Sequence, residues 1–233
     1  MINATDSKGT FYILNKKDRN PIIFIHGVGL DHSIWDPQIN EFDNTVLIYD
    51  ILGHGKTPLN KNDLSFDDFS DQIINLMDEL KFNKVHLVGF SIGSLIARNF
   101  ATRFNDRLAS LTLLCSIFNR SDKEQKIVND RFEQTKKDQK LTKDALKRWF
   151  TEDFLNKNPD ISDKIFNILQ NNNMNNFIKI YSLFVKHQDN EKFENIKTKT
   201  LVITGEGDVG STPEMSINLG KKIKNSVVKK QKY

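Results

Sequence analysis

The sequence has little cysteine and no long apolar run. Cys115 is the only cysteine among 233 residues, so it has no disulfide partner within the chain and fits a buried thiol in a reducing compartment. The first ten residues are polar, and no uninterrupted apolar run approaches the ~18–20 residues of a membrane span. We therefore expect a soluble, cytoplasmic protein with no signal peptide and no membrane partner.

The sequence also lacks the residue pattern of a nucleic-acid interface. The formal net charge is +4 and the pI is near 9.0, but the excess comes from lysines spread along the chain, with some crowding between residues 221 and 232. A nucleic-acid site needs arginines and aromatics interleaved on one surface. We expect no nucleic-acid partner, and the lysines fit a solvated face.

The length and a hydrophobic fraction of 38% predict a single α/β domain over residues 1–233. Strand-like and helix-like segments alternate, which is typical of a doubly wound, mostly parallel sheet with helices on its faces. Strands are predicted at residues 10–14, 21–25, 45–50, 84–90, 108–115, 200–204 and 226–230, and helices at 66–80, 92–104 and 213–224. Ser65 and Asp68 form a carboxylate variant of the capping box at the start of the first helix.

Residues 118–190 differ in character from the rest of the chain. Apolar residues recur three or four apart among charged and amide residues, which predicts several short helices separated by Pro159 and the asparagine-rich residues 171–176. We predict a helical lid over an active site, inserted into a core formed by residues 1–117 and 191–233. A plain surface excursion is the alternative.

The most informative stretch is Gly89-Phe90-Ser91-Ile92-Gly93, which has the form G-x-S-x-G. A strand-like run precedes it and a helix-like pattern follows it. This context is typical of a nucleophile elbow, in which a serine occupies a strained turn between a strand and a helix. Glycines are needed in such a turn because side chains there would collide with the neighbouring strand and helix.

A second glycine-rich turn, His26-Gly27-Val28-Gly29, ends the apolar run at residues 21–25. Glycines at the end of a central strand let the backbone approach a ligand and direct N–H groups toward it, as an oxyanion hole requires. A tight loop with no ligand is the alternative for this turn alone. Its occurrence together with the downstream elbow favours the oxyanion hole.

Asp208 follows the apolar run at residues 200–204. If the strands are parallel, Asp208 lies at the same sheet edge as Ser91 and Val28, because all three follow strand ends. A serine hydroxyl becomes a good nucleophile when an imidazole removes its proton, and a carboxylate must hold that imidazole. The three positions therefore predict most of a serine hydrolase site.

Taken together, these motifs resemble the α/β-hydrolase fold superfamily, and within it the group of 3-oxoadipate enol-lactonase and related esterases and carbon–carbon bond hydrolases. The resemblance covers nearly the whole chain and extends to Tyr49-Asp50 and to Gly53-His54-Gly55. It implies that Ser91 is the nucleophile, that Asp208 orients a histidine, and that the N–H groups of Val28 and Ile92 form the oxyanion hole. It also implies a substrate pocket lined by His26, Gly27, Gly29, Trp35 and Phe90. The expected partner is a small ester or lactone substrate. No organic cofactor is implied, and no metal, because no histidine and carboxylate cluster has ligand spacing.

The sequence departs from the family pattern after Asp208, where no histidine follows. In the family, the histidine lies just after the last strand and is followed by a final helix that covers one face of the sheet. Both are absent here, so we expect part of that face to be exposed. The histidines of this sequence are His26, His32, His54, His86 and His187. Of these, His187 at the end of the lid is the candidate for a substitute base.

Three hypotheses account for this departure. In the first and favoured one, the chain is a truncated form of a serine hydrolase. In the second, it is a natural non-catalytic protein that binds a small acyl or lactone-like ligand in the same pocket. In the third, it is an interaction protein that docks an anionic partner through its basic C-terminal segment, with salt-sensitive binding.

Overall fold

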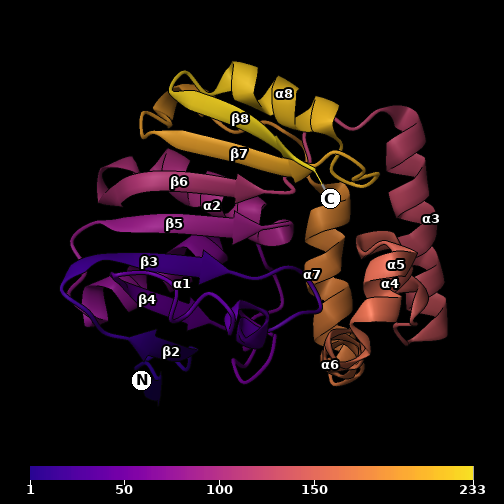
Figure 1. Cartoon of the computed structure of the whole chain (residues 1–233), viewed down its shortest axis with the longest axis horizontal. Coiled ribbons are helices and arrows are strands. Elements are labelled where there is room, and N and C mark those ends of the chain that lie inside the picture. The colour runs from indigo at the N-terminus through magenta and orange to yellow at the C-terminus, as the bar shows by residue number, and fades with distance from the viewer. Residues whose placement is uncertain (233) are drawn as a thin grey trace.

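The computed structural model describes residues 1–232 and contains one eight-stranded sheet (Figure 1). The strands lie in the order β1-β2-β4-β3-β5-β6-β7-β8. Their bounds are β1 (Ile2–Thr5), β2 (Phe11–Asn15), β3 (Arg19–Ile25), β4 (Asn44–Tyr49), β5 (Val85–Phe90), β6 (Leu108–Leu114), β7 (Thr200–Gly205) and β8 (Ser226–Gln231). The pairs β1–β2 and β2–β4 are antiparallel, and the remaining pairs are parallel. The prediction of a mostly parallel sheet is confirmed.

Three helices pack on one face of this sheet: α1 (Phe66–Glu79), α2 (Ile92–Arg103) and α8 (Pro213–Lys222). Their apolar residues join alternate residues of the central strands in the largest core cluster, in which Phe69 and Phe100 are fully buried. The capping box of α1 is present as predicted, with Ser65 and Asp68 each bonding the other's backbone. This face therefore holds most of the hydrophobic core.

The opposite face of the sheet is less covered. The short η1 helix (His32–Trp35) packs over β3 and β4 with a small cluster that includes Phe24 and Ile39. Next to it a groove of about 420 Å³ opens over β3, β5 and β6. The groove is lined by Ile22, Phe24, Phe42, Asn44, His86, Val88, Ser110 and Thr112. The groove leaves part of this face of the sheet open.

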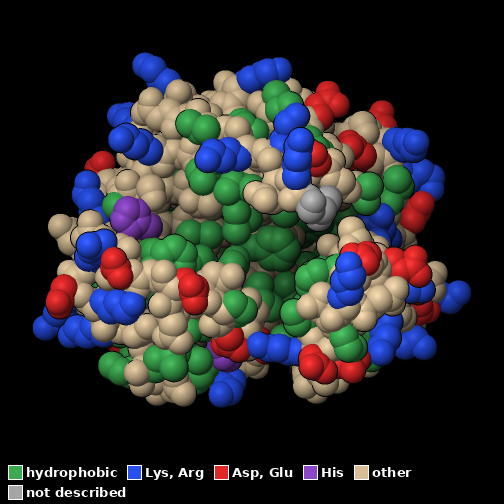
Figure 2. Space-filling view, in the orientation of Figure 1, with side chains coloured by type: hydrophobic (Ala, Val, Ile, Leu, Met, Phe, Trp, Pro, Cys, Tyr) green, Lys and Arg blue, Asp and Glu red, His purple; other side chains and the backbone are tan. Residues whose placement is uncertain are grey.

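A helical cap lies beyond the carboxyl ends of the strands (Figure 1). It contains α3 (Asp122–Asp138), α4 (Asp144–Trp149), α5 (Glu152–Lys157), α6 (Pro159–Gln170) and α7 (Met174–Lys186), whereas η3 (Phe193–Asn195) packs on α2 in the main core. The predicted series of short helices is thus present between β6 and β7. Figure 2 shows a hollow between the strand ends and the cap, with hydrophobic side chains at its bottom. No helix in residues 1–232 is both long and apolar enough to cross a bilayer.

The strand β1 has no counterpart in the sequence prediction. Its residues are mostly exposed, and it pairs on one side only, with β2 at the sheet edge. An exposed edge strand has no apolar face to bury, so its sequence lacks the alternation that identifies inner strands.

Candidate active site

Ser91 occupies a strained turn between β5 and α2. Its φ of 56° and ψ of −119° lie outside the regions that L-residues ordinarily adopt. Both flanking glycines are sterically required. A Cβ on Gly89 would lie 2.2 Å from the Gly93 carbonyl oxygen, and a Cβ on Gly93 would lie 2.6 Å from the Ile25 carbonyl oxygen. The structure thus has the strained turn between a strand and a helix that the G-x-S-x-G spacing predicts.

The turn after β3 lies directly beside this elbow. The two strands are parallel neighbours, with Ile25 opposite Gly89. A Cβ on Gly27 would lie 3.1 Å from Cδ1 of Phe90, so the glycine lets the two loops pack closely. The structure thus brings together the residues that the sequence assigned to the elbow and to the oxyanion turn.

Two backbone N–H groups at this junction remain available. Within residues 1–232, neither Val28 N nor Ile92 N donates a hydrogen bond to the protein backbone, whereas Gly29 N donates to Nε2 of His54 at 2.9 Å. Ile92 is the first residue of α2, where N–H groups have no partner within the helix. Free donors of this kind are what an oxyanion hole offers to a developing negative charge.

The prediction that His26 lines the substrate pocket is not met. Its side chain is fully buried, Nε2 accepts from Ile51 N at 3.1 Å, and Nδ1 lies 2.8 Å from the Gly27 carbonyl oxygen. Burial lowers the pKa of His26. The pKa of His54 is lowered to about 3, first by burial and then by the charge of the neighbouring His26. Both imidazoles are therefore neutral at physiological pH and hold the glycine turn in place.

Trp35 also lies elsewhere than predicted. It is buried on the less covered face of the sheet, and its ring centroid lies 4.8 Å from that of Phe24. Phe90 is partly buried and contacts both this cluster and a cap cluster that contains Leu146 and Leu169. Gly29 adjoins the cap, because a Cβ there would lie 2.9 Å from Cε2 of Phe177. Phe90 and Gly29 thus face the cap, while Trp35 supports the sheet.

Asp208 lies in the loop after β7, at the same sheet edge as Ser91 and two strands further along, with β6 between β5 and β7. Ser91 N donates to the Leu114 carbonyl oxygen at 3.0 Å, and Cys115 N donates to the Ile203 carbonyl oxygen at 2.8 Å. Oδ1 of Asp208 accepts from the N–H groups of Gly210 and Ser211, each at 2.8 Å. These bonds fix the carboxylate. Burial first, and then the negative charge of Asp208, raise the pKa of Cys115 to about 12, so the thiol is protonated.

The end of β8 reaches this edge as well. β8 runs parallel to β7, and Glu206 N donates to the Gln231 carbonyl oxygen at 3.0 Å. Residue 231 therefore lies next to the loop that carries Asp208.

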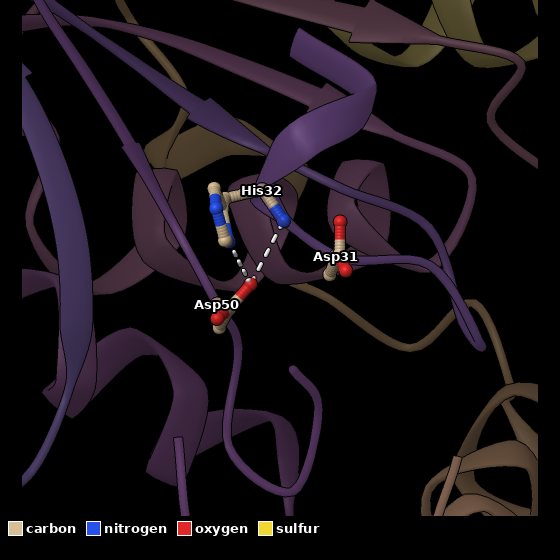
Figure 3. A group of neighbouring side chains, drawn as sticks. All are labelled: Asp31, His32 and Asp50. Carbon is tan, nitrogen blue, oxygen red and sulfur yellow. Dashed lines mark hydrogen bonds and ion pairs between the residues drawn. The ribbon is translucent and has the colours of Figure 1, made fainter. Parts of the chain in front are cut away.

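One cluster of histidine and carboxylate side chains surrounds Asp50. Nδ1 and N of His32 both lie 2.8 Å from Oδ1 of Asp50, and Figure 3 shows Asp31 beside this pair with no bond drawn to either residue. Lys56 N donates to Oδ2 of Asp50 at 2.9 Å, and Asp31 accepts from Ser33. Because protein donors already occupy these oxygens, the cluster fits a clamp between loops better than a metal site.

A second cluster surrounds Arg98 at the end of the cap. NH2 of Arg98 lies 2.6 Å from Oδ1 of Asp189 and 2.6 Å from Oε1 of Glu191, and the Arg98 side chain is fully buried. Nε2 of His187 lies 3.3 Å and 3.4 Å from the same two oxygens. The guanidinium occupies the position a cation would take between these carboxylates. His187 is engaged by this cluster, which removes the support for its role as a substitute base.

Sequence reasoning missed this cluster. Asp189 lies 91 positions after Arg98, so no local spacing connects the arginine with its carboxylate partners. One signal was present: Arg98 interrupts the apolar series Leu95, Ile96, Ala97 and Phe100 on a helix that faces the sheet. A charged residue on a buried helix face needs partners of opposite charge.

Comparisons with known proteins agree with this fold. The family model described as alpha/beta hydrolase fold matches residues 20–233. The (E)-2-((N-methylformamido)methylene)succinate hydrolase of Acinetobacter baylyi is 28% identical over 220 residues, which are 93% of this chain and 83% of that protein. The 3-oxoadipate enol-lactonase 1 of the same organism is 25% identical over 217 residues, covering 91% and 80%. A crystal structure of the enol-lactonase from Burkholderia xenovorans superimposes with a TM-score of 0.83 at 22% identity, covering 99% of this chain and 91% of that one.

Proposed function

Because the chain belongs to the alpha/beta hydrolase fold family, we propose that it is a serine hydrolase of small carboxylic esters or enol-lactones. The observation that carries the proposal is the strained Ser91 turn, packed against the His26-Gly27-Val28 turn with two free N–H groups. In this mechanism Ser91 attacks the carbonyl carbon, and the N–H groups of Val28 and Ile92 stabilise the oxyanion.

The relatives support the substrate class. Two of them are named as a hydrolase of a substituted succinate and as an enol-lactonase. Either reaction fits acyl chemistry at a serine. The leaving oxygen would take a proton from a histidine, departing as an alcohol from an ester or remaining on the opened acyl chain of a lactone, and water would then release the acyl group from Ser91.

The mechanism requires a histidine that Asp208 can orient. No histidine follows Asp208 in this sequence, so the proposal takes the base from a residue attached after β8, whose end lies beside the Asp208 loop. β8 neighbours β7, which carries the Asp208 loop, and two strands, β6 and β7, separate β8 from β5, which carries Ser91.

The test compares three proteins on small aryl esters and enol-lactones: the chain as given, its Ser91→Ala variant, and the chain extended by the loop and helix that follow the corresponding strand in a relative. Loss of the histidine in a serine protease costs about 10⁶-fold in kcat, although about 10³–10⁴ over water can remain from the oxyanion hole and binding. The first two proteins should be similarly weak, and the extended protein should gain several orders of magnitude.

Two results would contradict the proposal. Ser91-dependent turnover by the unextended chain would mean that a base is already present. No gain on extension, together with tight binding of an acyl ligand, would favour a non-catalytic binding protein. This second function has one observation in its favour: His32, His54, His86 and His187 are all engaged by other protein groups.

A further inference from the structure

One side chain of the cap bonds the oxyanion turn itself. Asn172 lies in the asparagine-rich residues 171–176, which by sequence mark only a break between two helices. Its Nδ2 donates to the Gly29 carbonyl oxygen at 2.8 Å. The same nitrogen lies 3.0 Å and 3.1 Å from the carbonyl oxygens of Ile168 and Leu169 in the last turn of α6. All three partners are acceptors, so an amide nitrogen can face them and a carboxylate cannot.

Gly29 is a central residue of the turn that carries the Val28 N–H group. Leu30 N donates to the Gly27 carbonyl oxygen at 3.2 Å, so residues 27–30 form a four-residue turn. The φ of Gly29 is 76°, which favours glycine at the third position of such a turn. A single closing bond leaves the central peptide groups free to rotate, so the direction of the Val28 N–H depends on what else holds the turn.

Side chains from two parts of the molecule hold the two peptide groups of Gly29. Its N–H donates to Nε2 of His54 at 2.9 Å, and its carbonyl oxygen accepts from Asn172. His54 is buried in the core, whereas Asn172 belongs to the cap. One half of this clamp is therefore always present, and the other half exists only while the cap is docked.

Apolar side chains of the cap close over the same glycine. A Cβ on Gly29 would lie 2.9 Å from Cε2 of Phe177 and 3.1 Å from Cδ2 of Leu169. Both side chains are buried, and they come from α7 and α6, the helices on either side of Asn172. Figure 1 shows α7 next to the carboxyl ends of the strands. A hydrogen bond screened from water in this way is stronger than an exposed one, and its acceptor is costly to leave unpaired.

We propose that Asn172 is a positioning residue of the oxyanion hole. By bonding the Gly29 carbonyl oxygen from the cap, it fixes the turn that directs the Val28 N–H, so the hole is complete only when α6 and α7 are docked. In a hydrolase, this link ties stabilisation of the oxyanion to closure of the cap over the substrate. The catalytic role rests on the proposed hydrolase function, whereas the link between Asn172 and the turn does not.

The first measurement needs no turnover and uses the chain as given. Asn172→Asp keeps the size of the side chain but replaces the donor by a carboxylate, which the three carbonyl oxygens repel. Asn172→Ala removes the bond without adding a charge. The matched control is Asn158→Asp, because Nδ2 of Asn158 donates to the Phe154 carbonyl oxygen at 2.9 Å at the end of another cap helix, α5. Amide hydrogen exchange and the backbone NMR resonances of residues 28–30 are compared in the four proteins.

Both Asn172 variants should accelerate exchange at Gly29 and Leu30, about tenfold for Asn172→Asp and about fivefold for Asn172→Ala, and should shift the resonances of the turn. The control should stay within about twofold of the parent chain. If Asn172 serves only to cap α6, exchange will rise in α6 alone. An unchanged turn in both Asn172 variants would therefore overturn the proposal.

The second measurement adds Asn172→Ala to the chain extended by a relative's loop and helix. Oxyanion contacts form in the transition state, so kcat should fall about tenfold while KM changes by less than about twofold. A rise in KM with unchanged kcat would mean that Asn172 acts in substrate binding and not through the hole. If the turn responds in the first measurement but the extended chain hydrolyses nothing, the link from the cap to the turn stands and the hydrolase proposal fails.

Discussion

Replacing Arg98 by methionine should destabilise the protein strongly, because Asp189 and Glu191 would lose their buried counter-charge. The Arg98 side chain is fully buried, and NH1 also donates to the Ile117 carbonyl oxygen at 2.8 Å. Removing one partner from a buried ion pair costs about 3–5 kcal/mol. Domains have about 5–15 kcal/mol of stability in total, so the loss is a large part of it.

The assay is urea and thermal unfolding followed by circular dichroism. A loss of about 3–5 kcal/mol corresponds to a fall in Tm of roughly 6–20 °C for a chain of this length. Arg103→Met is the matched control: it lies on the same helix and pairs with Asp71 at 2.8 Å, but its side chain is 30% exposed. Exposed pairs contribute about 0–1 kcal/mol.

A rescue variant separates charge from packing. In Arg98→Met combined with Asp189→Asn and Glu191→Gln, no charge remains unpaired, and most of the lost stability should return. The reasoning is refuted if Arg98→Met unfolds within about 1 kcal/mol of Arg103→Met, or if the triple variant is no more stable than the single one.

Three further perturbations have expected outcomes. Burial lowers the pKa of His187, but its bonds to Asp189 and Glu191 outweigh burial, so the pKa is raised in the folded protein. His187→Asn should therefore cost the most stability below pH about 6.5, and the cost should shrink as the pH rises through the raised pKa. Urea titrations across pH 5–9 would measure this change. Gly93→Ala should lower the free energy of unfolding in urea by about 1–3 kcal/mol or more, because its Cβ would lie 2.6 Å from a carbonyl oxygen. The control Gly210→Ala should be neutral, because its Cβ would lie 3.6 Å from the nearest atom. Equal losses in the two variants would contradict the steric argument. The chain as given should bind a hydrophobic dye at the open groove, and the extended chain should bind less; equal fluorescence would argue against exposure of that face.

The sequence predicted the fold well wherever a local pattern reported burial. Inner strands such as β3 and β4 are continuous apolar runs, and their observed bounds differ from the predicted ones by one or two residues. The edge strand β1 escaped because it buries no face. The elbow was predictable because the G-x-S-x-G spacing is a steric requirement, visible in the contact a Cβ would make at Gly89.

The pocket residues were predicted less well, because side-chain direction depends on packing that no motif encodes. Trp35 turns toward Phe24 on the less covered face, and His26 is bonded to backbone groups of its own turn and of the loop after β4. The Arg98 cluster joins residues far apart in the sequence, so only the folded chain could reveal it.

The position of α7 connects the cap to the core at two places. Phe177 and Ile180 of α7 rest on two glycine turns, because a Cβ on Gly53 would lie 2.8 Å from Cδ1 of Ile180 and one on Gly29 would meet Phe177. The C-terminal end of α7 leads directly into the buried cluster around Arg98. Loss of the ionic attachment should therefore loosen the C-terminal end of α7 more than the rest of the helix. In Arg98→Met, amide hydrogen exchange at that end should accelerate at temperatures where the variant is still folded. Unchanged exchange there would mean that the glycine contacts alone hold α7 in place.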